Sequence, residues 1–303
     1  MTSEEDKDLF GNIIEKKKIL REQFIEPPFT ILDSKQGNWQ RRKRTWKELG
    51  MRSEVGREGT TTGDNSFARV RHDNVELKDE TTQKLIDIGT VSIFDPALCE
   101  VLYTWFCKKG GKILDPFAGG SVRGIVAEYL GYKYTGIDIR KEQIDSNVEQ
   151  GIEILEENQQ PKWIIGDSNK ILDTLEEKFD FVFSCPPYGD LEVYSDLEDD
   201  ISNMEYSKFL ESYTEIIDKS CKLLKQNSYA CFVIGDFRDK KGNYRGFVAD
   251  TIKSFQGCGM PFYNDAVYVQ PTGSASMRAG GQMRNQKLVK IHQNILVFKK
   301  CLN

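Results

Sequence analysis

The sequence lacks long apolar runs, clustered histidines and paired cysteines. No stretch reaches 18 consecutive apolar residues, the length that indicates a membrane-spanning helix, and the acidic start MTSEEDKDLFGN has no signal-peptide pattern. There are 2 histidines, and the 7 cysteines are scattered without a CxxC pair. Neither a metal site nor a disulfide framework is therefore expected. We predict a soluble cytoplasmic protein with no metal and no membrane partner.

Basic residues gather in the N-terminal part of a chain whose net charge is -5. Between Leu32 and Arg71 there are ten Lys or Arg, including the run at 41–44, which lies close to Trp39 and Trp46. The segment is polar and dotted with glycine, so we expect it to contribute nothing to a core. The composition and hydrophobic pattern of the sequence change near residue 90. This change predicts a basic N-terminal region over 1–89 and a globular domain over 90–303.

Short apolar runs alternate with helical patterns from Val91 onward. The seven runs are KILDPF, YKYTGID, PKWIIGD, DFVFSCPP, YACFVIGD, NDAVYVQP and NILVFKK. This alternation predicts an α/β fold with a doubly wound, mostly parallel sheet of seven strands. Two sets of apolar residues fall on helical faces and are expected in the core: Ile144, Val148, Ile152 and Leu155, and Phe209, Tyr213, Ile217, Cys221 and Leu224. The stretch PTGSASMRAGGQMR predicts a long exposed loop.

Three successive predicted strands end on acidic residues. The first ends at Asp115 and runs into DPFAGGS, where Gly119 allows a close backbone approach. The second ends at Asp138, whose carboxylate can accept hydrogen bonds from two ribose hydroxyls, and the third ends on Asp167 and Ser168. Ligands of open parallel sheets bind at such ends, and the spacing lacks the GxGxxG pattern of pyrophosphate sites. The pattern favours a nucleoside-bearing cofactor without pyrophosphate over ordinary tight turns.

The order of several short motifs resembles one enzyme family. SIFDPALCEVL, DPFAGGS, GIDIR, GDS, CPPY and HQNILVFKK follow one another between residues 91 and 303. In this order they resemble the motifs of S-adenosylmethionine-dependent amino methyltransferases that act on DNA, of the N6-adenine or N4-cytosine type. The chain looks most like phage or prophage DNA modification methylases. The resemblance implies a Rossmann-like class I methyltransferase domain over 90–303. In this sequence, no large target-recognition segment lies between the GDS and CPPY strands or after the closing strand.

The resemblance also implies a role for each motif. By motif position, Phe94, Asp95 and Pro96 would contact the methionine end of the cofactor, and Asp115, Pro116, Phe117 and Gly119 would contact its centre. Asp138 would bind the ribose, and Asp167 and Ser168 would contact the adenine.

The stretch DFVFSCPPYGD carries the catalytic motif of this resemblance. In the family, the residue before two prolines is Asp, Asn or Ser, whose oxygen accepts a hydrogen bond from the target amino group, assisted by the first proline's carbonyl. Here Cys185 and Pro186 take those positions, Pro187 fixes the turn, and Tyr188 would stack on the flipped base. Sulfur is a weak acceptor, so Cys185 either replaces Ser imperfectly or acts differently. Acceptor help from Ser184 and a covalent role of an activated thiolate are the alternatives.

Charged segments point to DNA as the partner. Phosphate contacts are predicted for the basic residues Arg41, Arg42, Arg44, Arg278, Arg284 and Lys287, with Lys290 close to them. Trp39 and Trp46 are candidates for stacking on bases. The acidic segment DLEVYSDLEDD predicts a mobile lid or a partner-facing loop, and Asp236 and Arg238 are placed near the target base.

The motifs together predict a site-specific DNA methyltransferase that modifies a flipped base of double-stranded DNA, at either adenine N6 or cytosine N4. The N-terminal region over 1–89 is the candidate reader of the target. An RNA amino methyltransferase and a catalytically impaired nucleic-acid-binding protein are the alternatives. The resemblance implies a restriction-modification or phage setting, in the cytosol of a bacterium or of a phage-infected host.

Overall fold

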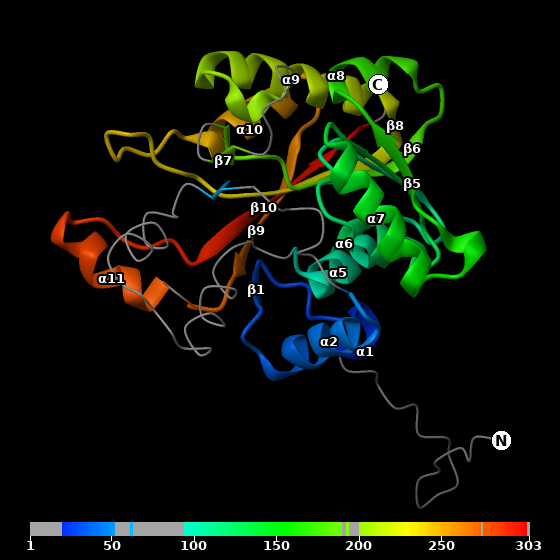
Figure 1. The fold of residues 1–303 in the computed structure, drawn as a ribbon, viewed down its shortest axis with the longest axis horizontal. Helices are drawn as coiled ribbons and strands as arrows, with labels where there is room; N and C mark the ends of the chain where they lie inside the picture. Colours follow the sequence, from blue (N-terminus) through cyan, green and yellow to red (C-terminus); the bar gives the residue numbers. More distant parts are fainter. Residues whose placement is uncertain are drawn as a thin grey trace, which may run out of the picture.

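The computed structural model describes residues 20–51, 61–62, 94–189, 192–193, 200–273 and 275–301. One sheet of eight strands has the order β1-β9-β10-β8-β6-β3-β4-β5 (Figure 1). Its strands are β1 (Ile31–Asp33), β3 (Lys112–Asp115), β4 (Lys133–Asp138), β5 (Lys162–Ile165), β6 (Phe179–Ser184), β8 (Leu224–Ile234), β9 (Phe262–Val269) and β10 (His292–Lys299).

The seven predicted apolar runs are strands β3, β4, β5, β6, β8, β9 and β10, and the predicted Rossmann-like α/β fold is confirmed. Strands β5, β4, β3, β6 and β8 are parallel, whereas β10 runs antiparallel to both β8 and β9. All residues of the central strand β6 are buried. This burial explains its continuous apolar run, because helices cover both faces of a parallel sheet.

The prediction of seven strands missed β1. This three-residue strand pairs in parallel with β9, where Ile31 lies opposite Val267 and Asp33 opposite Val269. The run ILD is too short to stand out in a polar segment. Its pairing depends on the free edge of β9, which lies far away in the sequence, and not on any local pattern.

The expectation that the basic N-terminal segment contributes nothing to the core is wrong. Helix α2 (Gly37–Glu48) buries Trp39 and Trp46, seven residues apart on one face, and Leu32 of β1 is buried beside them. The Trp46 ring packs edge-on against Tyr129, with centroids 5.0 Å apart. The two tryptophans are therefore core residues and are not available to stack on bases. The boundary predicted at residues 89 and 90 lies outside the described residues.

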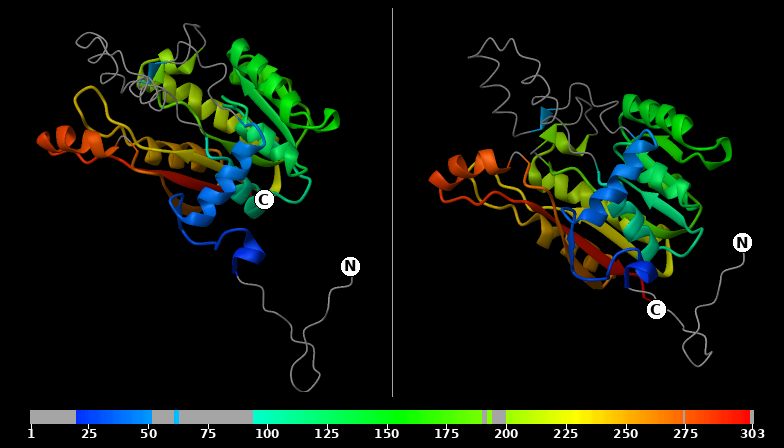
Figure 2. Two further views of the ribbon diagram at one scale, coloured as in Figure 1. Left: turned by 60° about the horizontal axis from the view of Figure 1, so that its bottom comes forward. Right: turned by 90° about the horizontal axis from the view of Figure 1, so that it is seen from below.

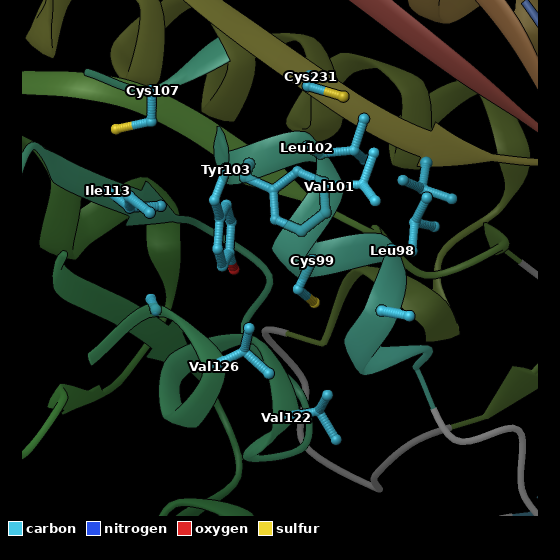
Figure 3. Close-up of a cluster of buried hydrophobic side chains, with 14 of the residues drawn as sticks. Leu98, Cys99, Val101, Leu102, Tyr103, Cys107, Ile113, Val122, Val126 and Cys231 are labelled. Carbon is cyan, nitrogen blue, oxygen red and sulfur yellow. The ribbon is translucent and has the colours of Figure 1, made fainter. Parts of the chain in front are cut away.

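Helices cover the two faces of the sheet with two apolar clusters. Figure 3 shows part of the first cluster, in which Cys99 and Tyr103 of α5 (Pro96–Phe106) point toward Val122 and Val126 of α6 (Val122–Tyr129). The second cluster lies under α9 (Tyr206–Leu223) and α10 (Phe247–Gly257). It buries the predicted core set Phe209, Tyr213, Ile217, Cys221 and Leu224. Among the described residues, no helix is long and apolar enough to cross a membrane.

The other predicted core set is half wrong. In α7 (Lys141–Ile154), Val148 is 40% and Ile152 67% exposed, whereas Ile144 and Leu155 are buried. The buried stripe of α7 is instead largely polar, comprising Gln143, Ile144, Asn147, Gln150 and Gly151. The reason is its neighbour, since α7 packs on the loop after β3 and supplies hydrogen bonds to that loop.

The fold also contains several smaller helices and strands. They are α1 (Leu20–Phe24), α8 (Ser168–Ile171), the 3-10 helices Glu157–Gln159, Leu172–Thr174 and Ile201–Asn203, and the paired strands β2 (Thr61–Thr62) and β7 (Glu192–Val193). Strand β7 belongs to the acidic segment 190–200, which apart from β7 and Asp200 lies outside the described residues.

The predicted exposed loop PTGSASMRAGGQMR contains the helix α11 (Ala275–Arg284). Ala, Met, Arg and Gln are good helix formers, which outweighs the two glycines within it. Helix α11 joins β9 to β10 and lies at the end of this hairpin, away from the centre of the sheet (Figure 2).

Candidate active site

The carboxyl ends of β3, β4, β5 and β6 lie at one edge of the sheet because these neighbouring strands are parallel. The loops that follow them contain DPFAGGS, GIDIR, GDS and CPPY. The fold therefore brings together four of the motifs singled out in the sequence.

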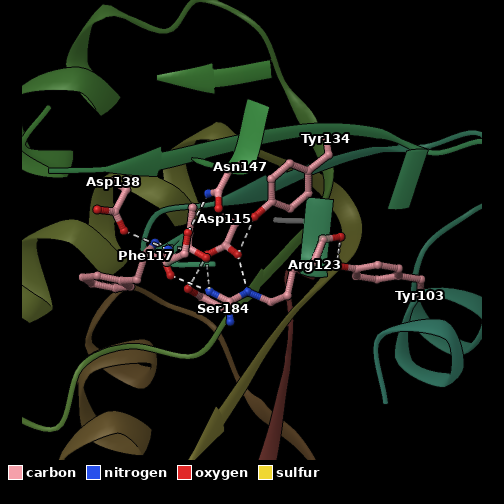
Figure 4. A network of polar contacts seen from close by, with 10 residues as sticks. Tyr103, Asp115, Phe117, Arg123, Tyr134, Asp138, Asn147 and Ser184 are labelled. Atoms are coloured by element: carbon pink, nitrogen blue, oxygen red, sulfur yellow. Dashed lines mark hydrogen bonds and ion pairs between the residues drawn. The ribbon is translucent and has the colours of Figure 1, made fainter. Parts of the chain in front are cut away.

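Asp115 is the centre of a buried polar network (Figure 4). Its Oδ1 accepts hydrogen bonds from the Phe117 N–H at 3.1 Å and the Ser184 hydroxyl at 2.6 Å. Its Oδ2 accepts from Arg123 Nε at 2.5 Å and the Tyr134 hydroxyl at 2.7 Å. With an exposed fraction of 0%, Asp115 has no surface toward a ligand. This burial favours a supporting role over the predicted direct contact with the cofactor, and Asp115 connects the loop after β3 to the loop after β6.

Arg123 completes this network and was missed by the sequence analysis. Its Nη2 donates to the carbonyls of Phe117 at 2.5 Å and Ala118 at 2.7 Å, so one guanidinium holds both the carboxylate of Asp115 and the loop backbone. Burial alone would lower the pKa of Arg123, but the Asp115 carboxylate outweighs it and the pKa is raised. The available signal was a single basic side chain in the otherwise apolar first turns of VRGIVAEY.

Asp138 lies at the tip of β4 with its carboxylate half-buried. Its Oδ2 accepts from the Gly119 N–H at 2.8 Å and its Oδ1 from the Arg140 N–H at 2.9 Å. Gly119 has a φ of +51°, a conformation that glycine adopts without strain. Burial raises the pKa of Asp138, and the two backbone hydrogen bonds oppose that rise. Each oxygen keeps a further acceptor position, so this carboxylate fits the two hydroxyls of a ribose.

Asp167 and Ser168 follow β5 and have different surroundings. Asp167 is half-buried and caps α8, accepting from the Asn169 N–H at 2.9 Å. Ser168 is buried, and its hydroxyl donates to the Pro116 carbonyl at 2.5 Å. Asp167 therefore retains a surface for a ligand, together with the half-buried ring of Phe117. Ser168 and the buried Pro116 join the loops after β5 and β3.

Asp95 is buried between three elements, with an exposed fraction of 4%. Its Oδ1 caps α5 by accepting from the Ala97 N–H at 2.9 Å. Its Oδ2 accepts from Tyr268 at 2.6 Å, Lys43 at 3.1 Å and Trp39 at 3.2 Å. Asp95 therefore joins α2 and β9 to α5, and this burial favours a supporting role over the predicted direct contact with the cofactor.

The neighbours of Asp95 in the same motif differ from each other. Pro96 is buried at the start of α5, where a proline costs no hydrogen bond. Phe94 is half-buried, and its ring lies 4.9 Å from the Arg123 guanidinium carbon and edge-on to Phe183. Of the predicted methionine-end residues, Phe94 alone keeps substantial surface.

The catalytic loop follows directly on the buried network. Ser184 donates its hydroxyl to Asp115 and is fully buried, which disfavours the alternative in which Ser184 shares the acceptor role. Cys185 and Pro187 are half-buried and Pro186 is buried. Tyr188 is half-buried as well, and its hydroxyl accepts from Gln293 Nε2 at 2.7 Å. The Asp115–Ser184 contact and the Gln293–Tyr188 contact thus hold the loop from both ends.

The end of β8 lies beside Tyr188. A Cβ placed on Gly235 would lie 3.7 Å from the Tyr188 hydroxyl and 3.5 Å from Lys290 Nζ, so Lys290 belongs to this site. Burial lowers the pKa of Lys290, and the charge of Asp236 opposes this. The ring of Phe237 meets Tyr188 edge-on at 6.0 Å. The charge of Lys290 was apparent from the sequence, but its position close to Gly235 at the end of β8 was not.

Asp236 and Arg238 have intramolecular partners. Asp236 Oδ1 accepts from the N–H groups of Phe237, Gly246 and Phe247 at 3.0 to 3.1 Å, which caps the start of α10. Arg238 donates to the Gly242 carbonyl at 2.7 Å, and its guanidinium lies 4.0 Å from the Tyr244 ring centre. Both residues shape the turn between β8 and α10, which is a structural role.

The predicted phosphate contacts are not equivalent in the structure. Arg42 pairs with Glu100 at 2.6 Å and donates to the Ile25 carbonyl, so it serves the contact between α2 and α5. Arg41, Arg44 and Arg284 are exposed, whereas Arg278 and Lys287 are half-buried. Within the parts of the chain that the structure describes, no group of three or more His, Cys, Asp or Glu side chains could hold a metal ion.

Comparison with known proteins identifies a family whose model matches this chain. The model of the N6/N4 methyltransferase family, described as DNA methylase, matches residues 20–149 and 179–303. No curated protein matches the chain at a significant level.

Several solved structures are similar in part. TrmN from Thermus thermophilus is 12% identical with a TM-score of 0.48, covering 74% of this chain and 55% of its own. A TehB-like SAM-dependent methyltransferase from Corynebacterium glutamicum is 17% identical with a TM-score of 0.42, covering 73% and 95%. Magnesium protoporphyrin IX methyltransferase from Synechocystis, solved with bound SAM, is 14% identical with a TM-score of 0.42, covering 78% and 92%.

The match to the family model extends over most of the chain and includes every motif of the site except GDS, which lies between the two matched segments. The chain therefore belongs to the N6/N4 DNA methylase family of S-adenosylmethionine-dependent enzymes, which methylate exocyclic amino groups in DNA.

Proposed function

We propose that this protein methylates adenine N6 or cytosine N4 of a base flipped out of double-stranded DNA. The observation that carries the proposal is the Asp115 network. One carboxylate holds the loop of the predicted cofactor site, through Phe117 and Arg123, and the loop of the predicted base site, through Ser184. Methyl transfer needs the two reactants aligned, and a shared buried anchor fixes the relative position of their two loops.

The residues at the sheet edge fit S-adenosylmethionine, which supplies a methyl group on a positively charged sulfur when it is bound. Asp138 would accept hydrogen bonds from the ribose hydroxyls, as its half-buried carboxylate and remaining acceptor positions allow. Phe117 and Asp167 would flank the adenine, and Phe94 the methionine end. Asp95, Asp115, Pro116 and Ser168 would act by holding these residues in place.

Asp138→Ala is expected to weaken S-adenosylmethionine binding. Losing hydrogen bonds to a charged acceptor costs about 1.5 to 3 kcal/mol, which is on the order of 10- to 100-fold in Kd. Isothermal titration calorimetry of the purified variant measures this directly. Asp145→Ala, on the exposed side of α7, is the matched control and should bind as the wild type does. An unchanged Kd for Asp138→Ala would remove the ribose assignment.

The catalytic loop would orient the target amino group. The Pro186 carbonyl and Cys185 sulfur would accept its two hydrogens, which weakens conjugation with the ring and localises the lone pair on nitrogen. Proline fixes the loop's φ and leaves no unpaired N–H there. Because Ser184 is fully buried whereas Cys185 is half-buried, we assign the second acceptor role to Cys185. Tyr188 would stack on the base.

Cys185→Ser is expected to raise the rate of methyl transfer. Oxygen is a stronger acceptor than sulfur, and a gain of about 1 kcal/mol in the transition state is about fivefold in kcat. Cys185→Ala should keep part of the activity, because the Pro186 carbonyl remains. Single-turnover transfer with saturating DNA measures both. Complete loss of activity in Cys185→Ser would instead support the covalent role of the thiol, which serine cannot replace.

Basic residues on both sides of the site would contact phosphates. Arg41 and Arg44 belong to the N-terminal region over 1–89, for which we retain the proposed role in target recognition. Arg284 and Lys287 lie between β9 and β10. Arg42 contributes less to this role, since its guanidinium is paired with Glu100.

One experiment tests the whole proposal. Purified protein is incubated with labelled S-adenosylmethionine and unmethylated genomic DNA, in parallel with total RNA, and the nucleosides are separated by mass spectrometry. The expected result is labelled N6-methyldeoxyadenosine or N4-methyldeoxycytidine from the DNA, and no labelled nucleoside from the RNA. Label in RNA alone would overturn DNA as the substrate. Cofactor binding without transfer to either would favour the catalytically impaired alternative.

A further inference from the structure

Helix α11 packs little against the part of the chain that the structure describes. Of its ten residues, Ala275 alone is buried, and the side chains of Met277 and Met283 are 69% and 60% exposed. Most helices in proteins depend on an apolar face that packs against the rest of the fold, and isolated helices of this length are marginal in water. The surface of α11 is therefore suited to a partner.

No contact among the described residues explains the two adjacent glycines of α11. A Cβ placed on Gly280 or Gly281 would meet none of the described atoms within 4 Å, and neither residue has a positive φ. Glycine is the least favourable helix residue apart from proline, so these two weaken the helix without relieving any contact or strain. The remaining physical use of glycine is a close approach to another molecule.

One face of α11 combines these glycines with exposed apolar and basic side chains. Met277, Gly280, Gly281 and Arg284 follow the i, i+3, i+4, i+7 spacing that places residues on the same side of a helix. The segment that follows β9 carries charge of one sign, since the chain has no Asp or Glu after Asp265. A surface that is basic, partly apolar and open to close approach is complementary to duplex DNA.

The position of α11 links this face to the active site. The segment that leads from α11 into β10 packs along the catalytic region. Lys287 lies against Gly242, in the turn after β8, and both Lys290 and the Tyr188 hydroxyl lie close to Gly235. Figure 1 shows α11 at the end of the β9–β10 hairpin, with its sides free of other described elements. A duplex whose target base reached Tyr188 would extend along this hairpin.

We propose that the face formed by Met277, Gly280, Gly281 and Arg284 docks in the major groove of the DNA beside the target base. The inference rests on the proposed function and adds the element that grips the duplex. The major groove accepts an α-helix. The glycines let the helix approach the sugar–phosphate wall closely, Arg284 pairs with a phosphate, and Met277 lies against the apolar edges of the bases.

The decisive variant is Gly280→Ala combined with Gly281→Ala. Two alanines favour the helix, so the thermal unfolding temperature should stay equal or rise, whereas the added methyl groups keep the helix from the groove. We expect the Kd for a methylatable duplex, measured by fluorescence anisotropy, to rise about tenfold or more. Gly257→Ala is the matched control, because Gly257 is also an exposed helical glycine with no atom near its Cβ position. It should leave the Kd unchanged.

Arg284→Gln supplies a second readout. Removal of one phosphate contact should reduce the slope of log Kd against log salt concentration by about one. The inference is overturned if both α11 variants bind the duplex like the wild type, or if the exposed face instead holds two copies of the chain together and the glycine double variant loses a wild-type dimer. Wild-type protein that binds no duplex at all would overturn the proposed function as well. Wild-type binding with unchanged variants overturns the α11 assignment alone.

Discussion

Arg123→Leu is expected to lower the free energy of unfolding by about 3 to 5 kcal/mol, the usual cost of removing one partner of a buried ion pair. Asp115 would remain at 0% exposure with no cation beside it. The carbonyls of Phe117 and Ala118 would lose their donor at the same time. The loop after β3 should therefore lose its fixed conformation, and S-adenosylmethionine binding should weaken together with stability.

Thermal unfolding with and without S-adenosylmethionine measures this prediction. Adding Asp115→Asn to Arg123→Leu should recover part of the loss, because the double variant no longer buries an unpaired charge. Lys222→Leu is the matched control, since Lys222 also pairs with a carboxylate, that of Asp218, but at the surface. Its unfolding temperature should change little. If Arg123→Leu were as stable as Lys222→Leu, the buried network would not be the anchor of the two loops.

Tyr188→Ala is expected to reduce kcat/KM for methyl transfer by one to two orders of magnitude. Stacking of an aromatic ring on a base is worth about 1 to 3 kcal/mol, and this contact is made only after the base leaves the duplex. Cofactor affinity should be unchanged, because the ring lies against Phe237 at the end of β8 and not at the tips of β3 and β4.

The variant Tyr188→Phe separates the contribution of the aromatic ring from that of the hydroxyl group. This variant keeps the stacking surface and loses the hydrogen bond from Gln293, so it should lose no more than about tenfold in kcat/KM. Transfer from labelled S-adenosylmethionine to a duplex with one target base gives both values, and calorimetry gives the cofactor Kd. Full activity of Tyr188→Ala would disprove the stacking role. Equal losses in both variants would assign the effect to the Gln293 contact instead.

The local chemistry of the fold was predictable from single segments. Each of the seven apolar runs became a strand, because a run such as FDFVFS is too apolar and too short to be anything but a buried strand. Predictions failed where a partner distant in sequence decided the outcome. Strand β1 forms only because β9 offers an edge, and Val148 is exposed because its helix turns a polar stripe toward the cofactor loop.

The burial of the N-terminal tryptophans also could not be predicted from the local sequence. Trp39 and Trp46 stand among arginines and lysines in a segment that looks like a solvated surface. Helix geometry places both on one face, and that face meets α5, where Asp95 accepts from Trp39 and Glu100 from Trp46. Charge content describes the outer face of such a helix and says nothing of the inner one.

The sequence by itself determined which motifs stand at the ends of which strands, because strand, turn and helix signals are local and parallel strands carry their carboxyl ends to one edge. It could not determine what each carboxylate does. Asp95, Asp115 and Asp138 all stand at the ends of apolar runs or the starts of helices and look alike in the sequence. Only the tertiary structure surrounds Asp115 with Arg123, Tyr134 and Ser184, and Asp95 with residues 52 to 173 positions away. Burial by such distant partners makes two of these carboxylates internal supports and leaves Asp138 open to a ligand.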